Sequence, residues 1–136
     1  MIDPYLFFDG CCEEALAFYR DALNAEVSML MRFRESPEAD AFPPEQADKI
    51  MHAHFHVAGG SIMASDSAED GTKGFAGFAL SLPTADPAAA RRTFDALAAG
   101  GTIQMPLQAT FWSPAFGIVR DRFGVPWMVS APAAES

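Results

Sequence analysis

The order of apolar and polar residues predicts a strand followed by a helix near the start of the chain. Residues 5–8 form a short apolar run, which is typical of a buried strand. From Cys12 to Leu23 the apolar residues return at helical spacing, and two glutamates occupy the first turn, where the helix dipole favours anions. Asn24 follows the last apolar position and suits the left-handed conformation that ends a helix.

The first half of the chain continues with three strand-like runs separated by polar segments. The predicted strands are residues 26–33, 50–58 and 61–66, and the predicted loops are residues 34–48 and 67–73. Gly59-Gly60 lies between the last two strands as a dipeptide that tolerates positive φ, so these strands are expected to form a hairpin.

The same pattern then restarts. Asp86 is a good helix N-cap, Pro87 suits the first helical position, and the helical spacing runs to Ala99. The strands predicted around this helix are residues 75–82, 102–108, 115–121 and 125–131. The segment 121–124 reads as a hairpin turn with local hydrogen bonds.

Matching residues recur between the two halves at nearly constant offsets. The matched pairs are Phe18 and Phe94, Val27 and Ile103, Met29 and Met105, and farther on Gly59 and Gly124, Met63 and Met128, and Ser65 and Ser130. A single copy would leave one sheet face uncovered, so the copies should pair. We therefore expect an α+β fold in which two βαβββ modules form a curved mixed sheet with a central cavity and outer helices. The chain would be a single domain, 1–136, with modules of about residues 1–70 and 74–132.

This layout and several short strings resemble the PhnB-like family of the vicinal-oxygen-chelate superfamily, which includes glyoxalase, bleomycin-resistance proteins and dioxygenases. The strings are residues 5–10 (YLFFDG), 12–15 (CEEA), 18–19 (FY), 49–53 (KIMHA), 62–66 (IMASD), 111–112 (FW), 116–117 (FG), 121–125 (DRFGV) and 127–128 (WM). PhnB-like proteins are often labelled 3-demethylubiquinone-9 3-methyltransferases. The sequence does not support that activity, because Gly59-Gly60 joins two strands rather than a strand and a cofactor-binding helix.

The resemblance also implies where a metal centre would lie. Metal-dependent relatives use four His, Glu or Gln side chains, and their positions fall at Pro4, Met63, Gly77 and Met128 in this sequence. None of these residues is a hard ligand for a divalent ion. We therefore expect neither the family's metal nor another cofactor.

All three histidines, His52, His54 and His56, alternate along one predicted strand and so share a face. A turn at Gly59-Gly60 would pair His56 with Met63 and turn this face toward the cavity. Two readings remain open: binding or acid–base groups, since imidazole titrates near neutral pH and ligates metals, or polar residues on a partly wet strand. Neighbouring imidazoles could reach one ion, but three in a row hardly converge.

Other side chains are candidates for the cavity wall. The apolar contacts expected there are Leu6, Phe8, Met63, Met128 and Trp112, with polar contacts from His54, His56 and His52. Trp112 either stacks on a planar ligand or packs in the core. The methionines, Met29, Met31, Met63, Met105 and Met128, form either an adaptable wall or core filling.

Composition narrows the functions further. The 136 residues carry a net charge of −9 with scattered basic residues, which argues against nucleic-acid binding. No apolar run approaches the length of a membrane span, so we expect a cytoplasmic protein without membrane partners. Cys11 and Cys12 are adjacent and are either a reduced pair or a reactive thiol at a helix N-terminus.

Two functions follow from these observations. The first is metal-independent binding of a small hydrophobic or aromatic molecule in the sheet cavity. The second is a glyoxalase/dioxygenase-like enzyme that uses His52, His54 and His56 as metal ligands or acid–base groups. In both cases the expected partners are a small-molecule ligand and a second copy in a homodimer, since uncovered sheet edges favour pairing.

Overall fold

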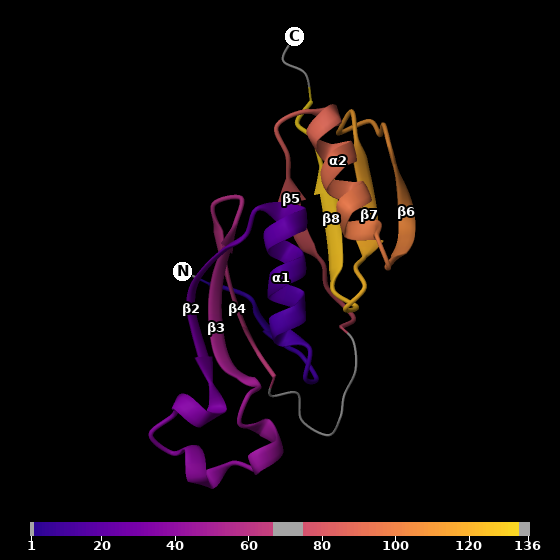
Figure 1. Cartoon of the computed structure of the whole chain (residues 1–136). Helices are drawn as coiled ribbons and strands as arrows, with labels where there is room; N and C mark the ends of the chain where they lie inside the picture. The colour runs from indigo at the N-terminus through magenta and orange to yellow at the C-terminus, as the bar shows by residue number, and fades with distance from the viewer. Residues whose placement is uncertain (1, 67–74, 134–136) are drawn as a thin grey trace. The chain divides into compact units, whose positions relative to one another are not determined.

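The computed structural model describes residues 2–66 and 75–133, and the predicted loop at 67–73 lies outside them. The chain divides into two compact units, residues 1–73 and residues 74–136 (Figure 1). Within the described residues, no helix is long and apolar enough to cross a membrane.

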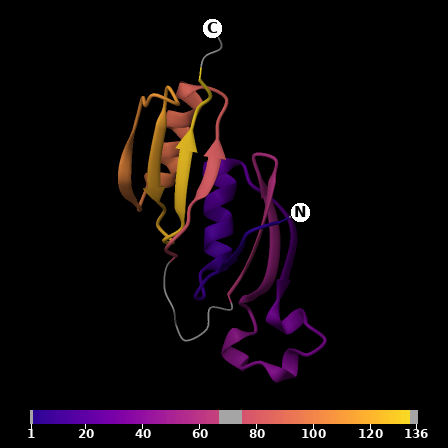
Figure 2. The same cartoon turned by 180° about the vertical axis from the view of Figure 1, so that it is seen from behind.

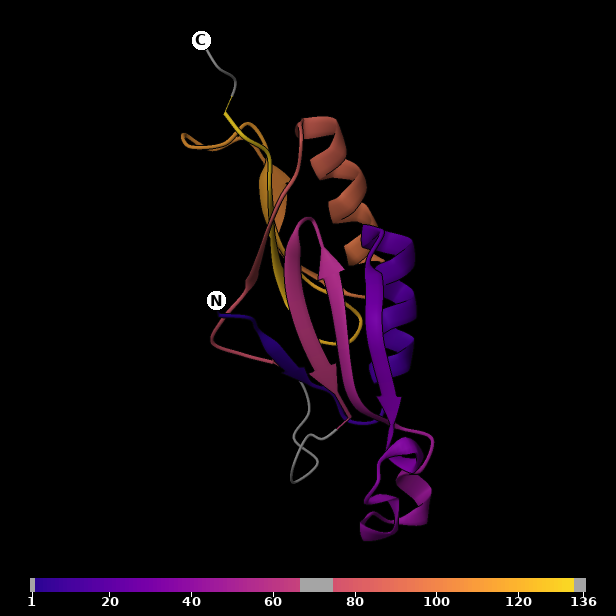
Figure 3. The same cartoon turned by 90° about the vertical axis from the view of Figure 1, so that its left-hand side faces the viewer.

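The first unit is a four-stranded sheet with one helix. Its elements are β1 (Tyr5–Phe7), α1 (Cys12–Leu23), β2 (Glu26–Arg32), β3 (Ile50–Val57) and β4 (Gly60–Ser65). The strand order is β1-β4-β3-β2, with β1 parallel to β4 and the other neighbours antiparallel. Helix α1 lies along one face (Figure 3), where Tyr19 stacks on Phe55 with ring centroids 5.9 Å apart.

The second unit repeats this topology. Its elements are β5 (Leu80–Pro83), α2 (Pro87–Ala98), β6 (Thr102–Gln108), β7 (Phe116–Arg120) and β8 (Pro126–Ser130). The order is β5-β8-β7-β6, and β5 and β8 run parallel side by side (Figure 2). The predicted α+β fold of two βαβββ modules is thus confirmed, in the form of two four-stranded mixed sheets.

The helix ends follow the local chemistry of the sequence. Helix α1 spans the predicted residues, and Asn24 after it adopts φ 54° and ψ 37°, the left-handed conformation. The Asp86 carboxylate accepts a hydrogen bond from the Ala89 N–H at 2.8 Å and so caps α2, while Pro87 opens the helix. Both predictions from cap residues are confirmed.

The predicted loop at 34–48 contains regular turns. Three short 3₁₀ helices, Phe33–Glu35, Ala39–Ala41 and Pro44–Gln46, connect β2 to β3. Phe33 is 5 % exposed and packs edge-on against Phe42, with ring centroids 4.8 Å apart. This aromatic pair gives the connection a small core of its own.

The turn between β3 and β4 differs from the prediction by one residue. It is formed by Ala58 (φ 51°) and Gly59 (φ 84°) rather than Gly59-Gly60. A two-residue turn of this kind needs positive φ at both positions, and Ala58 accepts the strain while Gly60 joins the strand. His56 therefore pairs with Ser61 and His54 with Met63. Moving the turn by one residue changes the partner of each histidine by two positions. Because side chains alternate between the two faces of a strand, the histidines remain on the predicted face.

Candidate functional site

The two faces of the first sheet carry different chemistry. The face under α1 is apolar and closed, with side chains from β3 and β4 that are at most 7 % exposed: Ala53, Phe55, Val57, Ile62 and Ala64. The alternating residues point to the opposite face, which α1 does not cover. That face carries His52, His54, His56, Ser61 and Met63, and we call it the histidine face.

His54 lies in the middle of the histidine face between two methionines. Across the sheet, it is directly paired with Met29 on β2 and with Met63 on β4. Its Nε2 atom has less than 1 Å² of exposed surface and no hydrogen-bond partner among the described residues. Leaving a buried polar atom without a hydrogen bond costs about 1–3 kcal/mol, so this nitrogen is energetically unfavourable where it lies.

The other two imidazoles are hydrogen-bonded within the sheet. The two ring nitrogens of His56 each lie 3.1 Å from a serine hydroxyl, Nε2 from Ser28 and Nδ1 from Ser61. His52 Nδ1 lies 3.1 Å from the Tyr5 hydroxyl. His56 and His52 are therefore held in place by hydroxyl groups, whereas His54 Nε2 has no hydrogen-bond partner in the described part of the chain.

Aromatic rings gather on the β1 side of the same face. Tyr5 lies 4.7 Å from Phe7 and 5.6 Å from His52, measured between ring centroids. Phe7 is 51 % exposed, so about half of this side chain is in contact with solvent.

The predicted contacts Leu6 and Phe8 lie elsewhere. Leu6 pairs with Ala64 and is 1 % exposed, and Phe8 is 2 % exposed. Both residues belong to the core, and Tyr5 and Phe7 take the place beside the histidines that was predicted for Leu6 and Phe8. The sequence did not reveal this because four apolar residues in a row show no alternation from which the facing side could be read.

The second sheet carries the matching positions of its own unit. Met128 pairs with Ile118, which in turn pairs with Met105. The methionine pair of the first sheet is therefore repeated, with Ile118 in place of His54. Trp112 is 50 % exposed and packs edge-on against Phe116 at 5.3 Å between ring centroids.

The residues at the family's metal positions do not fit a hard divalent ion. In the first sheet, the residue beside Met63 is Tyr5 rather than Pro4. In the second sheet, the residue beside Met128 is Ser81, because Gly77 lies before the start of β5. Thioethers, a phenol and a hydroxyl are poor ligands for such an ion. Across residues 2–66 and 75–133, no three His, Cys, Asp or Glu side chains lie close enough together to hold a metal.

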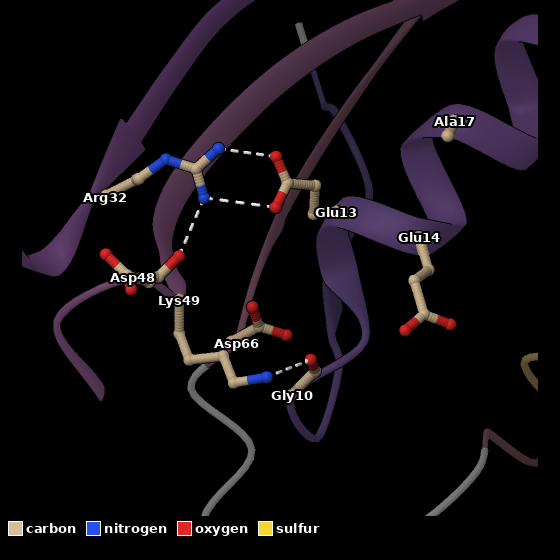
Figure 4. A pocket seen from close by; sticks show the side chains of 8 residues that line it. All are labelled: Gly10, Glu13, Glu14, Ala17, Arg32, Asp48, Lys49 and Asp66. Carbon is tan, nitrogen blue, oxygen red and sulfur yellow. Dashed lines mark hydrogen bonds and ion pairs between the residues drawn. The ribbon is translucent and has the colours of Figure 1, made fainter. Parts of the chain in front are cut away.

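A separate polar pocket of about 360 Å³ lies at the start of α1 (Figure 4). It is lined by Gly10, Glu13, Glu14, Ala17, Arg32, Asp48, Lys49 and Asp66. The Arg32 guanidinium donates to both Glu13 carboxylate oxygens, at 3.1 and 2.5 Å, and Lys49 Nζ donates to the Gly10 carbonyl at 2.9 Å. These cations are already paired, so the pocket ties the helix to the strands rather than offering free charge.

The two cysteines beside this pocket lack the environment of a reactive thiolate. Cys12 is buried, and burial, followed by the nearby Asp66 carboxylate, raises the pKa of its thiol. The pKa of Cys11 is also raised, first by burial and then by Asp66. The acidic neighbours and burial outweigh the helix N-terminus here.

The fold defines the class of protein. It is shared with the fosfomycin resistance protein FosX from Listeria monocytogenes, at a TM-score of 0.64, 12 % identity and coverage of 98 % of this chain and 93 % of that one. The class is thus that of α+β proteins built from two βαβββ modules.

Within that class, the model of the family described as 3-demethylubiquinone-9 3-methyltransferase matches residues 1–130, and the chain belongs to this family. It is 39 % identical over 137 residues to the protein YjdN of Escherichia coli K12, covering 95 % of this chain and 93 % of YjdN. The crystal structure of PA1353 from Pseudomonas aeruginosa matches at 42 % identity and a TM-score of 0.85, covering 97 % of each chain. The PhnB protein from Bacillus cereus matches at 27 % identity and a TM-score of 0.80, covering 96 % of this chain and 98 % of PhnB.

Proposed function

We propose that this protein binds a small hydrophobic or aromatic molecule on the histidine face, through direct side-chain contacts and without a metal ion between ligand and protein. The observation that carries the proposal is the aromatic group of Tyr5, Phe7 and His52, in which Phe7 is 51 % exposed on a sheet face that α1 leaves open. A planar ligand would bury this ring and gain about 25 cal/mol for each Å² of apolar surface removed from water.

The polar residues of the face support the same function. An apolar pocket gains specificity from a few placed polar groups, and on this face His54 pairs with Met63 and His56 with Ser61. Methionine adapts to irregular ligands and makes favourable contacts between sulfur and aromatic rings. In the second unit, Met128 offers a thioether on β8, and Trp112, which precedes β7, offers an aromatic ring.

The alternative, a glyoxalase/dioxygenase-like enzyme with His52, His54 and His56 as metal ligands, has less support. Two of the three imidazoles already have a ring nitrogen held by serine or tyrosine hydroxyls. The three side chains do not form a convergent set in the described part of the chain.

The test is a binding titration with a neutral bicyclic aromatic, naphthalene or indole, followed by NMR. Phe7→Ala should weaken binding at least tenfold, which corresponds to about 1.4 kcal/mol. Ile103→Ala is the matched control, because Ile103 is also 51 % exposed but lies on the second sheet. Equal binding by the wild type and Phe7→Ala, or no binding of either aromatic by the wild type, would overturn the proposal.

A further inference from the structure

Three adjacent strands place two thioethers and one imidazole in a single row. Met29, His54 and Met63 are direct cross-strand partners on β2, β3 and β4. Their side chains therefore stand on the same face, each one strand spacing from the next. The His54 Nε2 atom is buried there without a hydrogen-bond partner in the described residues.

The side chains of this row can reach one ion. Direct cross-strand partners have Cβ atoms about 4.5–5.5 Å apart, so both methionines begin close to the imidazole. Because methionine has three rotatable bonds, Met29 and Met63 can each bring a sulfur to an ion that His54 Nε2 holds.

The donor set selects the kind of ion. Thioether sulfur is a soft ligand that favours copper(I), whereas calcium, magnesium and manganese prefer oxygen ligands. The positive charge of the ion is also acceptable here, because Glu26 lies opposite His56 on the same face and the chain carries a net charge of −9.

We infer that Met29, His54 and Met63 form a binding site for a soft monovalent cation, copper(I) or its redox-inert analogue silver(I). The inference goes beyond the proposed binding of an aromatic molecule and does not depend on it. The second unit supplies an internal comparison: Met105 and Met128 repeat the thioether pair, but Ile118 replaces the imidazole. That row lacks the nitrogen and should not hold the ion.

The test measures silver(I) by calorimetry and copper(I) by anaerobic competition with a chromophoric chelator. Thiols also bind these ions, so the measurements use a Cys11→Ser/Cys12→Ala chain whose fold is checked by circular dichroism. One equivalent should bind to this chain. His54→Ile, which copies the residue of the second unit, should abolish that equivalent, and Met63→Leu should weaken binding at least tenfold. Met105→Leu is the matched control and should change nothing.

A gain of function completes the test. Ile118→His builds a second row of methionine, histidine and methionine and should raise the stoichiometry from one ion to two. Should the cysteine-free chain fail to fold, the wild type and His54→Ile are compared directly, and the variant should bind one equivalent less. An unchanged stoichiometry and affinity in His54→Ile would overturn the inference.

The two proposals fail separately. Phe7→Ala removes an aromatic contact but none of the three ion ligands, so it should leave silver binding unchanged. Absence of ion binding together with normal aromatic binding would reject the cation site alone, and the reverse result would reject only the aromatic site.

Discussion

At the scale of single residues, the difference between His54 and Ile118 sets the two units apart. Each residue lies between two methionines in the middle of its sheet, but only the His54 side chain has polar atoms. Its Nε2 atom is buried and has no hydrogen-bond partner within residues 2–66 and 75–133. The second unit has an isoleucine at the matching position, which buries no polar atom. Burying an unpaired nitrogen at this position of the first unit is unfavourable for stability. The cation site proposed above would give this nitrogen a partner.

A substitution at Gly59 tests the geometry of the turn between β3 and β4. Gly59→Ala should lower the free energy of unfolding by about 1 kcal/mol, because Gly59 has φ 84° and an added Cβ would meet nothing within 4 Å, so the cost is backbone strain alone. Gly60→Ala is the control, with Cβ at an ordinary 3.5 Å from the Val57 carbonyl, and should change stability by less than about 0.5 kcal/mol. Urea unfolding measures both, and equal effects would contradict the turn at Ala58-Gly59.

Cys12 should resist alkylation in the native protein. Its pKa is raised above the ordinary value of 9.0 by burial and by Asp66, so the thiol stays protonated at pH 8.5. The stability associated with this raised pKa is fully present below pH 9 and is lost as the pH rises further, because only the unfolded chain ionises readily. Mass spectrometry after iodoacetamide treatment should show Cys12 modified only in denaturant; rapid native modification would contradict the assignment.

At the scale of the elements, Asp66 links the start of α1 to the sheet. Its carboxylate accepts hydrogen bonds from the backbone N–H groups of Cys12 at 2.8 Å and Ile50 at 3.0 Å. Asp66→Ala would leave both buried donors unpaired and should destabilise the protein by about 2–5 kcal/mol, measured by urea unfolding. The exposed Asp40→Ala should change stability by less than about 0.5 kcal/mol. A similarly small effect for Asp66→Ala would show that this link is not structural.

The elements differ in how well the sequence predicts them. The helix bounds could be predicted because capping is local chemistry: Asn24 and Asp86 each act within a few residues of their own position. The predicted register of the β3–β4 hairpin differs from the observed one by two residues. The reason is that both Ala58-Gly59 and Gly59-Gly60 can form a two-residue turn, and the sequence does not decide between them. On β1, the sequence analysis placed Leu6 rather than Tyr5 beside the histidines. Residues 5–8 are all apolar, so no alternation of apolar and polar residues shows which side chains share a face.

At the scale of the whole molecule, the internal repeat could be predicted because matching residues recur at nearly constant offsets. The lack of a hydrogen-bond partner for His54 Nε2 within the described residues could not be predicted, because it depends on which side chains surround this atom in three dimensions. The charged pocket at the start of α1 was also missed, because Arg32 and Glu13 are far apart in the sequence and meet only through the fold.

The chain should form a homodimer. Strands β1 and β2 are the edges of the first sheet, and β5 and β6 those of the second, so each described sheet has strand edges without a neighbour. Such edges favour pairing with another chain. Light scattering coupled to size-exclusion chromatography should give twice the 14.6 kDa of one chain. A mass of one chain at all concentrations would contradict this prediction.

The central claim is that a small aromatic molecule binds on the histidine face. Methionine methyl NMR tests it most directly, with naphthalene titrated into protein labelled at the methyl groups of its seven methionines. The Met63 signal should shift in a saturable manner, because Met63 pairs with both Tyr5 and His54 on that face. Saturable shifts confined to other methionines, with the Met63 signal unmoved, would contradict the claim.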